Sequence, residues 1–219
     1  MAAKTALITG ASRGIGREVA RTLASEGWHV IAAVRDPSSA PPETEAEIVD
    51  MADPASIDAL AQRLREKNRQ IDALVNNAGI YKGPSPDIWA VNVLGPLRLT
   101  RALEPLLAPN GSVVMVTSGL GALSAQPRSL AERLSDPKLT LDDIERLATE
   151  APNGYDGSKA ALNAMARLFA ARLEPRGITV SAIDPGWVRT EMGGRNAPLS
   201  VAQGAARVLR GVRLTSPAH

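Results

Sequence analysis

Short runs of consecutive apolar residues alternate along the chain with segments in which apolar residues recur every three or four positions. An unbroken apolar run is typical of a strand buried on both faces, and the wider spacing is typical of a helix with one buried face. The runs predict strands at residues 5–9, 28–34, 47–49, 71–75, 112–117 and 178–183. The wider spacing predicts helices at about residues 15–27, 54–64, 87–107 and 154–173, and a last helix that starts at Ser200.

The alternation of strands and helices predicts a parallel sheet with helices on both faces, because parallel strands are joined by crossover connections. We therefore expect an α/β fold with one doubly wound sheet of six strands. No internal repeat or linker divides the 219 residues, so residues 1–219 are expected to form a single domain. The stretch 119–153 is less regular and is predicted to contain two short helices, at 130–134 and 141–148.

The composition excludes several classes of protein. Apolar residues make up 44% of the chain and charged residues 22%, which rules out disorder over most of its length. No apolar run is long enough to cross a membrane, and the first residues lead directly into a strand rather than a secretory signal. The chain has no cysteine, which excludes disulfides and thiolate metal sites and favours a cytoplasmic location.

The charge pattern argues against a nucleic-acid partner. Lysine and arginine number 25 against 23 acidic residues, they are scattered, and aromatic residues are only 3% of the chain. A nucleic-acid surface needs clustered cations and, for single strands, stacking aromatics. We expect no metal site either, because no residues cluster with metal-ligand spacing.

A glycine-rich segment, Thr9-Gly10-Ala11-Ser12-Arg13-Gly14-Ile15-Gly16, joins the first predicted strand to a helix. Glycines permit a tight turn and let a diphosphate approach the backbone, and the helix N-terminus supplies N–H donors and a favourable dipole. The spacing, Gly-x3-Gly-x-Gly, differs from the general dinucleotide fingerprint, Gly-x-Gly-x-x-Gly. The alternative interpretation is a glycine-rich turn that binds no ligand.

A second candidate site is Tyr155-Asp156-Gly157-Ser158-Lys159, at the start of a predicted helix. Residues four apart share one helix face, so the phenol of Tyr155 and the ammonium of Lys159 are expected to be neighbours. A phenol has an ordinary pKa of ~10, and a nearby ammonium favours phenolate, which suits the phenol to acid–base catalysis near neutrality. Taken alone, such a pair is a weak signal, and two surface residues without a catalytic role are the more common interpretation.

The position of the other polar motifs favours the catalytic interpretation. Asn76-Asn77-Ala78-Gly79 follows the fourth predicted strand, Ser118 ends the fifth, and Pro185-Gly186-Trp187-Val188-Arg189-Thr190 follows the sixth. The carboxyl ends of parallel strands form the edge at which open α/β sheets bind their ligands. We therefore expect these segments to converge with the glycine-rich segment on one site.

With these motifs, the chain resembles the classical short-chain dehydrogenase/reductase family over nearly its whole length. The resemblance rests on residues 9–16, 76–79 and 185–190, on Asn92 within Val91-Asn92-Val93, on Ser118, and on Tyr155 with Lys159. It implies a Rossmann-type fold that binds NAD(P). It also implies a catalytic role for four residues: proton donation by Tyr155, ribose binding and lowering of the tyrosine pKa by Lys159, orientation of the substrate oxygen by Ser118, and anchoring of a relay water by Asn92.

Two features resemble the carbonyl reductase subgroup. Ser118 and Tyr155 are farther apart in sequence than in most of the family, which implies a helical insertion at about 119–153, and residues 185–192 read Pro-Gly-Trp-Val-Arg-Thr-Glu-Met. The segment between Gly79 and Asn92 is short for the family, and the seventh strand that normally follows the last helix is missing. Trp187 either lines the substrate mouth or only covers the sheet.

The resemblance also implies a set of cofactor-binding residues. The end of the second predicted strand carries Arg35 where a 2′-phosphate would lie, and Val34 takes the place of the acid that selects NAD. Asp36 is the one feature that favours NAD, and an Arg35–Asp36 ion pair is the alternative role for both. We expect NADPH/NADP to be preferred. The expected cofactor-binding residues are Gly10, Ser12, Arg13, Gly14, Ile15, Gly16, Arg35, Asp50, Met51, Asn77, Ala78, Gly79, Tyr155, Lys159, Pro185, Gly186, Val188 and Thr190.

The leading hypothesis is an NADPH-dependent reductase of aldehydes or ketones that also oxidises alcohols. The alternatives are a non-enzymatic NADP(H)-binding sensor on the same fold, and a dehydratase or epimerase. A small-molecule carbonyl or alcohol is the expected substrate, although its identity is not determined by the sequence. A monomer is favoured over a homodimer, because the insertion precedes the Tyr155 helix and is expected to cover the face through which family members commonly dimerise.

Overall fold

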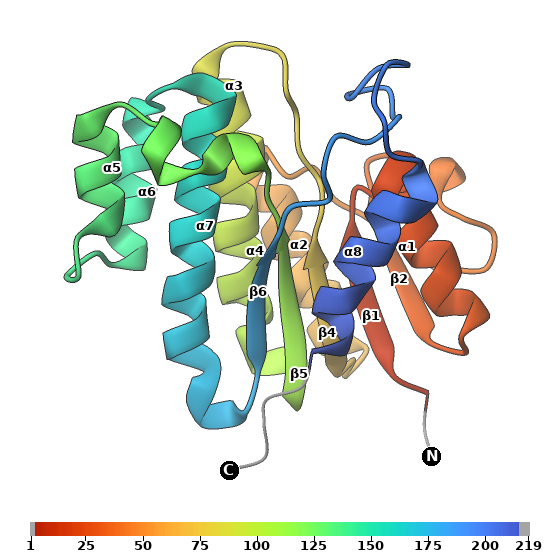
Figure 1. The fold of residues 1–219 in the computed structure, drawn as a ribbon. Coiled ribbons are helices and arrows are strands. Elements are labelled where there is room, and N and C mark those ends of the chain that lie inside the picture. The colour runs from red at the N-terminus through yellow and green to blue at the C-terminus, as the bar shows by residue number, and fades with distance from the viewer. Residues whose placement is uncertain (1–2, 215–219) are drawn as a thin grey trace.

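The computed structural model describes residues 3–214, and its six strands form one sheet in the order β3-β2-β1-β4-β5-β6 with every pair parallel. This order confirms the predicted Rossmann-type α/β fold, since the chain starts in the middle of the sheet and winds outward in both directions (Figure 1). The strands are β1 (Thr5–Thr9), β2 (His29–Val34), β3 (Glu45–Ile48), β4 (Ile71–Asn76), β5 (Leu107–Val116) and β6 (Thr179–Ile183).

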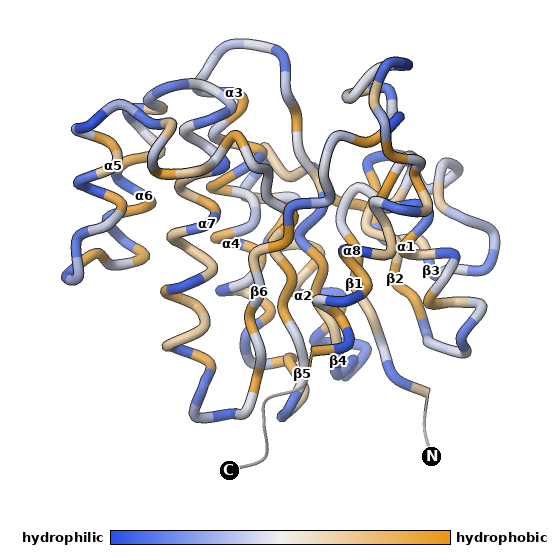
Figure 2. The backbone as a smooth tube through the Cα atoms, viewed as in Figure 1, coloured by the Kyte–Doolittle hydropathy of each residue, from blue (hydrophilic) through white to orange (hydrophobic). Residues whose placement is uncertain are grey.

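Helices cover both faces of the sheet, as the alternating pattern predicts. Successive residues of a strand point to opposite faces, so in β1 Leu7 joins one buried cluster while Ala6 and Ile8 join the other. Both clusters are apolar, which is why the strands are unbroken apolar runs (Figure 2). The first cluster includes α2 (Pro54–Glu66), α4 (Gly95–Leu103) and α7 (Gly154–Leu173), and the second includes α1 (Gly14–Ser25) and α8 (Val201–Arg213).

The single helix predicted over 87–107 is wrong in detail. The segment contains α3 (Ser85–Trp89), a π-helical turn (Ala90–Leu94), α4 and a 3₁₀ turn (Glu104–Leu106). The α-helix ends at Leu103, and Pro105, which has no N–H to donate back along an α-helix, lies in the 3₁₀ turn that follows. The π-helical turn coincides with Asn92, whose side chain bonds to a neighbouring loop.

Strand β5 starts earlier than expected. The pair Asn110-Gly111, which is typical of a turn, is instead an irregularity inside the strand, where Asn110 has a positive φ of 59° and the pairing with β4 shifts register. The strand before this irregularity pairs Leu107 with Ile71, and the strand after it pairs Ser112 with Ala73. Strand β5 is therefore paired with β4 both before and after Asn110-Gly111.

The segment 119–153 contains the two expected helices, α5 (Arg128–Ser135) and α6 (Leu141–Glu150). Both pack beside α7, and Leu130, Leu134, Ile144 and Leu147 join the same buried cluster as that helix (Figure 1). Among residues 3–214, no helix is both long and apolar enough to cross a membrane.

Candidate active site

The glycine-rich segment forms a tight turn between β1 and α1 that leaves no room for larger side chains. Gly10 and Gly14 have positive φ angles of 67° and 56°. A Cβ on Gly16 would lie 2.4 Å from Nδ2 of Asn77 and 2.5 Å from the carbonyl oxygen of Gly10. No side chain caps the N-terminus of α1, so the N–H groups of its first turn remain available to an anion.

The Asn-Asn-Ala-Gly motif braces this turn. Nδ2 of Asn77 donates to the carbonyl oxygens of Thr9 (2.9 Å) and Gly10 (3.3 Å). The backbone N–H groups of Asn77 and Ala78 both donate to the buried Thr9 hydroxyl oxygen, at 3.0 Å each. These four bonds join the carboxyl ends of β1 and β4, so residues 77–79 and the glycine-rich turn form one surface.

The loop after β6 closes over the same turn. Gly186 has a positive φ of 82°, and the buried Pro185 and Val188 hold the loop against α8, with Val188 packed on Gly204. The Thr190 Cγ2 atom lies 3.3 Å from the position that a Cβ on Gly14 would take. The structure thus brings together residues 10–16, 77–79 and 185–190, as expected from their positions at strand ends.

Asp50 and Met51 follow β3, which is the edge strand of the sheet next to β2. The Asp50 carboxylate accepts the N–H of Ala52 at 2.9 Å, and the Met51 carbonyl packs against Gly95 at the start of α4. A Cβ on Gly95 would lie 2.6 Å from that carbonyl oxygen. This loop is therefore held by local bonds and close packing.

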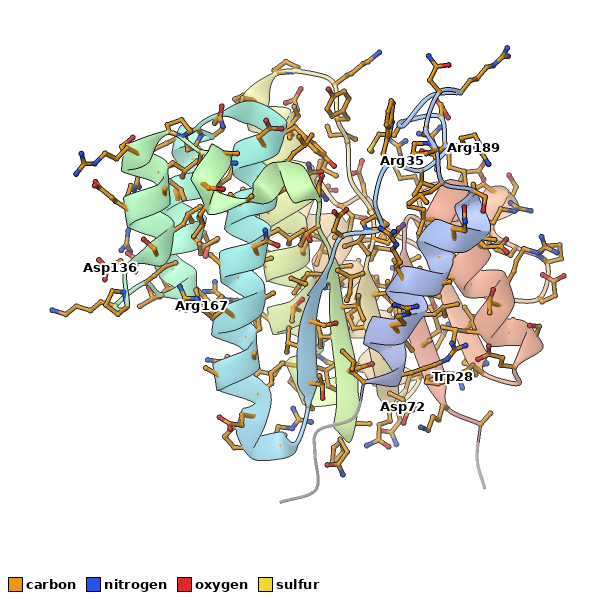
Figure 3. All side chains as sticks on the ribbon, viewed as in Figure 1. Trp28, Arg35, Asp72, Asp136, Arg167 and Arg189 are labelled. Carbon is orange, nitrogen blue, oxygen red and sulfur yellow. The ribbon has the colours of Figure 1, made fainter. Side chains whose placement is uncertain are left out.

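The geometry at the end of β2 distinguishes a free Arg35 from an Arg35–Asp36 ion pair. The Asp36 carboxylate accepts the backbone N–H (2.9 Å) and the hydroxyl (2.7 Å) of Ser38, and these bonds lower the pKa of Asp36. Arg35 is exposed, and no Arg35–Asp36 ion pair occurs among residues 3–214. Arg35 follows the carboxyl end of β2, at the same edge of the sheet as the other motifs (Figure 3).

Two further arginines lie at this end of the site. Arg13 is exposed, and its guanidinium pairs with Glu191 at 2.5 Å. Arg17 was not singled out in the sequence, yet its guanidinium donates to the carbonyl oxygens of Ser12 (3.1 Å) and Ser39 (3.2 Å). Arg17 therefore ties the glycine-rich turn to the loop that follows Arg35. The only indication of this role in the sequence was that Arg17 is a cation near the start of α1.

The catalytic candidates meet at the end of β5. Ser118 follows this strand, and Tyr155 and Lys159 lie one turn apart near the start of α7. The Tyr155 phenol hydrogen-bonds Ser118, and the buried Lys159 donates from Nζ to the carbonyl oxygen of Val116 at 2.8 Å. Burial lowers the pKa of Lys159 to about 8, because it removes water from the ammonium, and Asp184 opposes this shift.

The lowered pKa expected for Tyr155 is not seen. Burial raises the pKa of Tyr155 to about 12, and the nearby carboxylates of Asp184 and Asp156 add to the shift, while the Ser118 hydrogen bond opposes it. Lys159 does not offset these effects, since its Nζ is bonded to Val116 and lies 5.5 Å from the centre of the tyrosine ring. The Tyr155 phenol is therefore neutral at physiological pH when the protein carries no ligand.

Asn92 is buried within the π-helical turn, and both ends of its amide are bonded. Its Oδ1 accepts the N–H of Ile80 (2.9 Å), and its Nδ2 donates to the carbonyl oxygen of Ile80 (3.0 Å) and to the Ser158 hydroxyl (3.1 Å). A Cβ on Gly79 would lie 3.1 Å from Oδ1 of Asn92 and 3.7 Å from Nζ of Lys159. Asn92 and Lys159 thus flank Gly79, and the Ser158 bond connects the π-helical turn to α7.

Sequence reasoning missed two residues beside Tyr155. The rings of Tyr81 and Tyr155 meet edge to face, with centroids 4.9 Å apart. Asp184 lies at the end of β6 and acts electrostatically on both Tyr155 and Lys159. Both residues lie next to or near a recognised motif, and this proximity was the only indication of their role in the sequence. Tyr81 follows Gly79 by two residues, and Asp184 directly precedes Pro185.

Trp187 does not cover the sheet. Its side chain is exposed, with 59% of its surface accessible, and its indole N–H donates to the carbonyl oxygen of Gly193 at 2.8 Å. The bond holds the loop that follows Thr190 close to Trp187. The tryptophan is therefore a rim residue at the carboxyl edge of the sheet.

A glycine-rich helix N-terminus beside a buried tyrosine–lysine pair, at the carboxyl edge of a doubly wound sheet, defines a Rossmann-type oxidoreductase. The profile of the family described as short chain dehydrogenase matches residues 4–129, and that described as Enoyl-(Acyl carrier protein) reductase matches residues 139–209. The chain belongs to the short-chain dehydrogenase/reductase family, and it is carbonyl reductase-like.

Three similar proteins illustrate this relationship. (+)-Neomenthol dehydrogenase of Arabidopsis thaliana is 32% identical, over 94% of this chain and 90% of its own length. Carbonyl reductase [NADPH] 1 of Sus scrofa is 31% identical, over 92% of this chain and 84% of its own. A short chain dehydrogenase of Burkholderia cenocepacia, solved in complex with NADP, is 26% identical with a TM-score of 0.74, over 97% of this chain and 94% of its own.

The raised pKa of Tyr155 can be measured directly, because the chain has only two tyrosines. In Tyr81→Phe, which keeps the ring contact, tyrosinate absorbance reports Tyr155 alone. We expect a midpoint well above 10.0, approaching the pKa of about 12. Because the folded state holds this proton more tightly than the unfolded state, the free energy of unfolding should fall as the pH rises from about 10 to about 12. A native midpoint equal to that of the unfolded chain would contradict this prediction.

Proposed function

We propose that this protein is an NADPH-dependent reductase that converts an aldehyde or ketone to an alcohol, and the reverse. The observation that carries the proposal is the Tyr155 phenol, which is hydrogen-bonded to Ser118 and stands one helical turn from the buried Lys159. A sensor that only binds a dinucleotide has no need of a proton-donating phenol beside the lysine that would hold the ribose. The names of the neomenthol dehydrogenase and carbonyl reductase relatives support the same chemistry.

The residues at the edge of the sheet fit a dinucleotide. A Cβ on Gly10 or Gly16 would occupy the space beside the first turn of α1, and the uncapped N–H groups there suit a diphosphate. Residues 77–79 and 185–190 would hold the nicotinamide half, and Lys159 would bind its ribose. When bound, the cofactor supplies the hydride, and the protein's part is orientation, exclusion of water and a proton.

Side chains of the protein hold and donate that proton. Because its pKa is about 12, Tyr155 carries its phenolic proton at neutral pH and can donate it to the substrate oxygen. The Ser118 hydroxyl, which is bonded to the same phenol, orients that oxygen. Asn92 holds the Ile80 backbone and Ser158 in fixed positions behind Lys159, which suits the end of a proton relay.

The rim of the site favours an apolar substrate. Four large apolar side chains are exposed on the segments that adjoin the catalytic residues, and exposed apolar groups around a site with few polar groups are typical of small-molecule pockets. They are Tyr81, Leu120, Trp187 and Met192.

Replacing the proton donor provides the direct test. We expect Tyr155→Phe to reduce kcat/KM at least ~100-fold while NADPH binding and stability stay near wild type, because only one hydroxyl is removed. Turnover is measured by NADPH consumption across a panel of aldehydes, ketones and quinones, and binding by NADPH fluorescence. Tyr81→Phe is the matched control and should keep most of the activity. Wild-type turnover in Tyr155→Phe would show that the mechanism is wrong.

The preference for NADPH rests on Arg35. Its guanidinium is exposed at the end of β2, and the competing carboxylate of Asp36 is bonded to Ser38. Arg13 lies in the glycine-rich turn, and because its pair with Glu191 is exposed and therefore weak, its guanidinium is also available to an anion. Two available cations without an available carboxylate favour a 2′-phosphate over a 2′-hydroxyl.

We expect the wild-type protein to bind NADPH more tightly than NADH, and Arg35→Ala to remove most of this difference by weakening NADPH alone. Dissociation constants for both cofactors are measured by calorimetry. Arg128→Ala removes an equally exposed arginine from α5 and should leave the preference unchanged. Equal dissociation constants in the wild-type protein would instead indicate that Asp36 sets the choice.

We also propose that the protein is a monomer. Helices α5 and α6 pack against α7, the helix that bears Tyr155 and Lys159, and bury apolar residues between them. A second copy cannot use a face of α7 that these helices already occupy. Light scattering at micromolar concentration should therefore give the 23.0 kDa mass of one chain, and a mass of two or four chains would refute the proposal.

A further inference from the structure

A single carboxylate, that of Asp184, faces the catalytic groups from the sheet side of the site. Asp184 follows β6 directly and is exposed. Its Oδ1 accepts the N–H of Gly186 at 2.8 Å, which fixes the direction of the side chain. Its Oδ2 lies 3.2 Å from the position that a Cβ on Gly119 would take, so the carboxylate adjoins the Ser118-Gly119 turn.

The charge of Asp184 reaches both members of the catalytic pair. It raises the pKa of Tyr155 and that of Lys159, in agreement with its contact with the turn at Gly119 beside Ser118. Oδ2 receives no hydrogen bond from residues 3–214. The carboxylate therefore has an oxygen available to a group that lies between Ser118 and the exposed rim.

No cation forms an ion pair with Asp184 among residues 3–214, although Nη1 of Arg207 on α8 lies 2.6 Å from the position that a Cβ on Gly186 would take. Lys159 is buried and points its Nζ at the carbonyl of Val116. Lys82 is exposed on the loop that carries Tyr81, and Arg13 is paired with Glu191. Asp156, on the other side of Tyr155, adds negative charge.

We infer that Asp184 is a specificity-determining residue, and that its carboxylate favours carbonyl substrates with a cationic substituent over substrates with an anionic one. The inference rests on the proposed reductase activity. A substrate whose carbonyl oxygen contacts Ser118 and Tyr155 must place its substituents toward the rim beside Asp184. Because Asp184 is exposed, a unit charge about 6 Å from its carboxylate changes binding by about threefold in either direction, so the preference for a cation over an anion changes about tenfold.

The test compares three benzaldehydes that differ in one para substituent: a carboxylate, a hydrogen or a trimethylammonium group. The measured quantity is the ratio of kcat/KM for the cationic aldehyde to that for the anionic aldehyde, with NADPH as reductant. We expect Asp184→Asn to lower this ratio about tenfold, and kcat/KM for the uncharged benzaldehyde reports any change in basal activity. Comparing this ratio between variant and wild type cancels any general loss of activity and the intrinsic reactivity of each aldehyde. Asparagine keeps an oxygen that can accept the Gly186 N–H.

Asp136→Asn is the matched control. The Asp136 carboxylate is also exposed and accepts an N–H two residues ahead, that of Lys138, at 2.8 Å. It lies at the far end of the insertion, away from the strand ends (Figure 3). This variant removes the same charge and the same kind of bond, and it should leave the ratio at the wild-type value. An equal fall in both variants would overturn the inference, because it would reflect net charge alone.

A second measurement does not depend on turnover. In the Tyr81→Phe background, Asp184→Asn should lower the midpoint of the Tyr155 absorbance titration, because it removes a carboxylate that disfavours phenolate. An unchanged midpoint would overturn the assigned position of Asp184. A lowered midpoint with an unchanged kcat/KM ratio would overturn its role in specificity. If the wild-type protein reduces none of the aldehydes, ketones or quinones while the midpoint shifts, the proposed reductase function fails, and the position of Asp184 stands.

Discussion

The hydrogen bonds that join Thr9 to Asn77 hold together the part of the molecule on which the rest of the site depends. The Thr9 hydroxyl is fully buried between the two central strands, where it donates to Val75 and accepts from Asn77 and Ala78. Buried polar groups without partners are costly, so this arrangement is stable only as a complete set. The turn that results has no room for a Cβ at Gly10 or Gly16 and leaves the first turn of α1 facing solvent.

Helix α7 connects this turn to the acid–base chemistry. The start of the helix carries Tyr155, Ser158 and Lys159, and each bonds to a different residue of the site: Ser118 after β5, Asn92 in the π-helical turn, and the carbonyl of Val116 at the end of β5. The insertion begins against the same helix, since a Cβ on Gly121 would lie 2.6 Å from the backbone of Lys159. The buried lysine is thus surrounded on several sides, which lowers its pKa and also keeps water from it. Asp184 then supplies the opposite charge from the remaining side.

Much of the fold could be predicted because it depends on local patterns. Strands buried on both faces must be apolar throughout, so the six runs identified the sheet, and the positions of the glycine, asparagine and serine motifs at strand ends predicted which residues meet. The predicted helix over 87–107 failed where a local pattern is not sufficient. The π-helical turn at Asn92 exists because its side chain bonds to Ile80 and Ser158, which lie elsewhere in the chain.

The sequence by itself determined the parallel α/β order, the glycine-rich turn and the identity of the tyrosine–lysine pair, since each follows from spacing along the chain. Only the tertiary structure decided how these groups behave. Burial and nearby carboxylates raise the pKa of Tyr155 where its lysine neighbour alone would lower it, and Ser38 occupies the carboxylate of Asp36, so that Arg35 is the residue left available. A pKa or a free charge depends on every group within several ångströms, and most of those groups are distant in sequence.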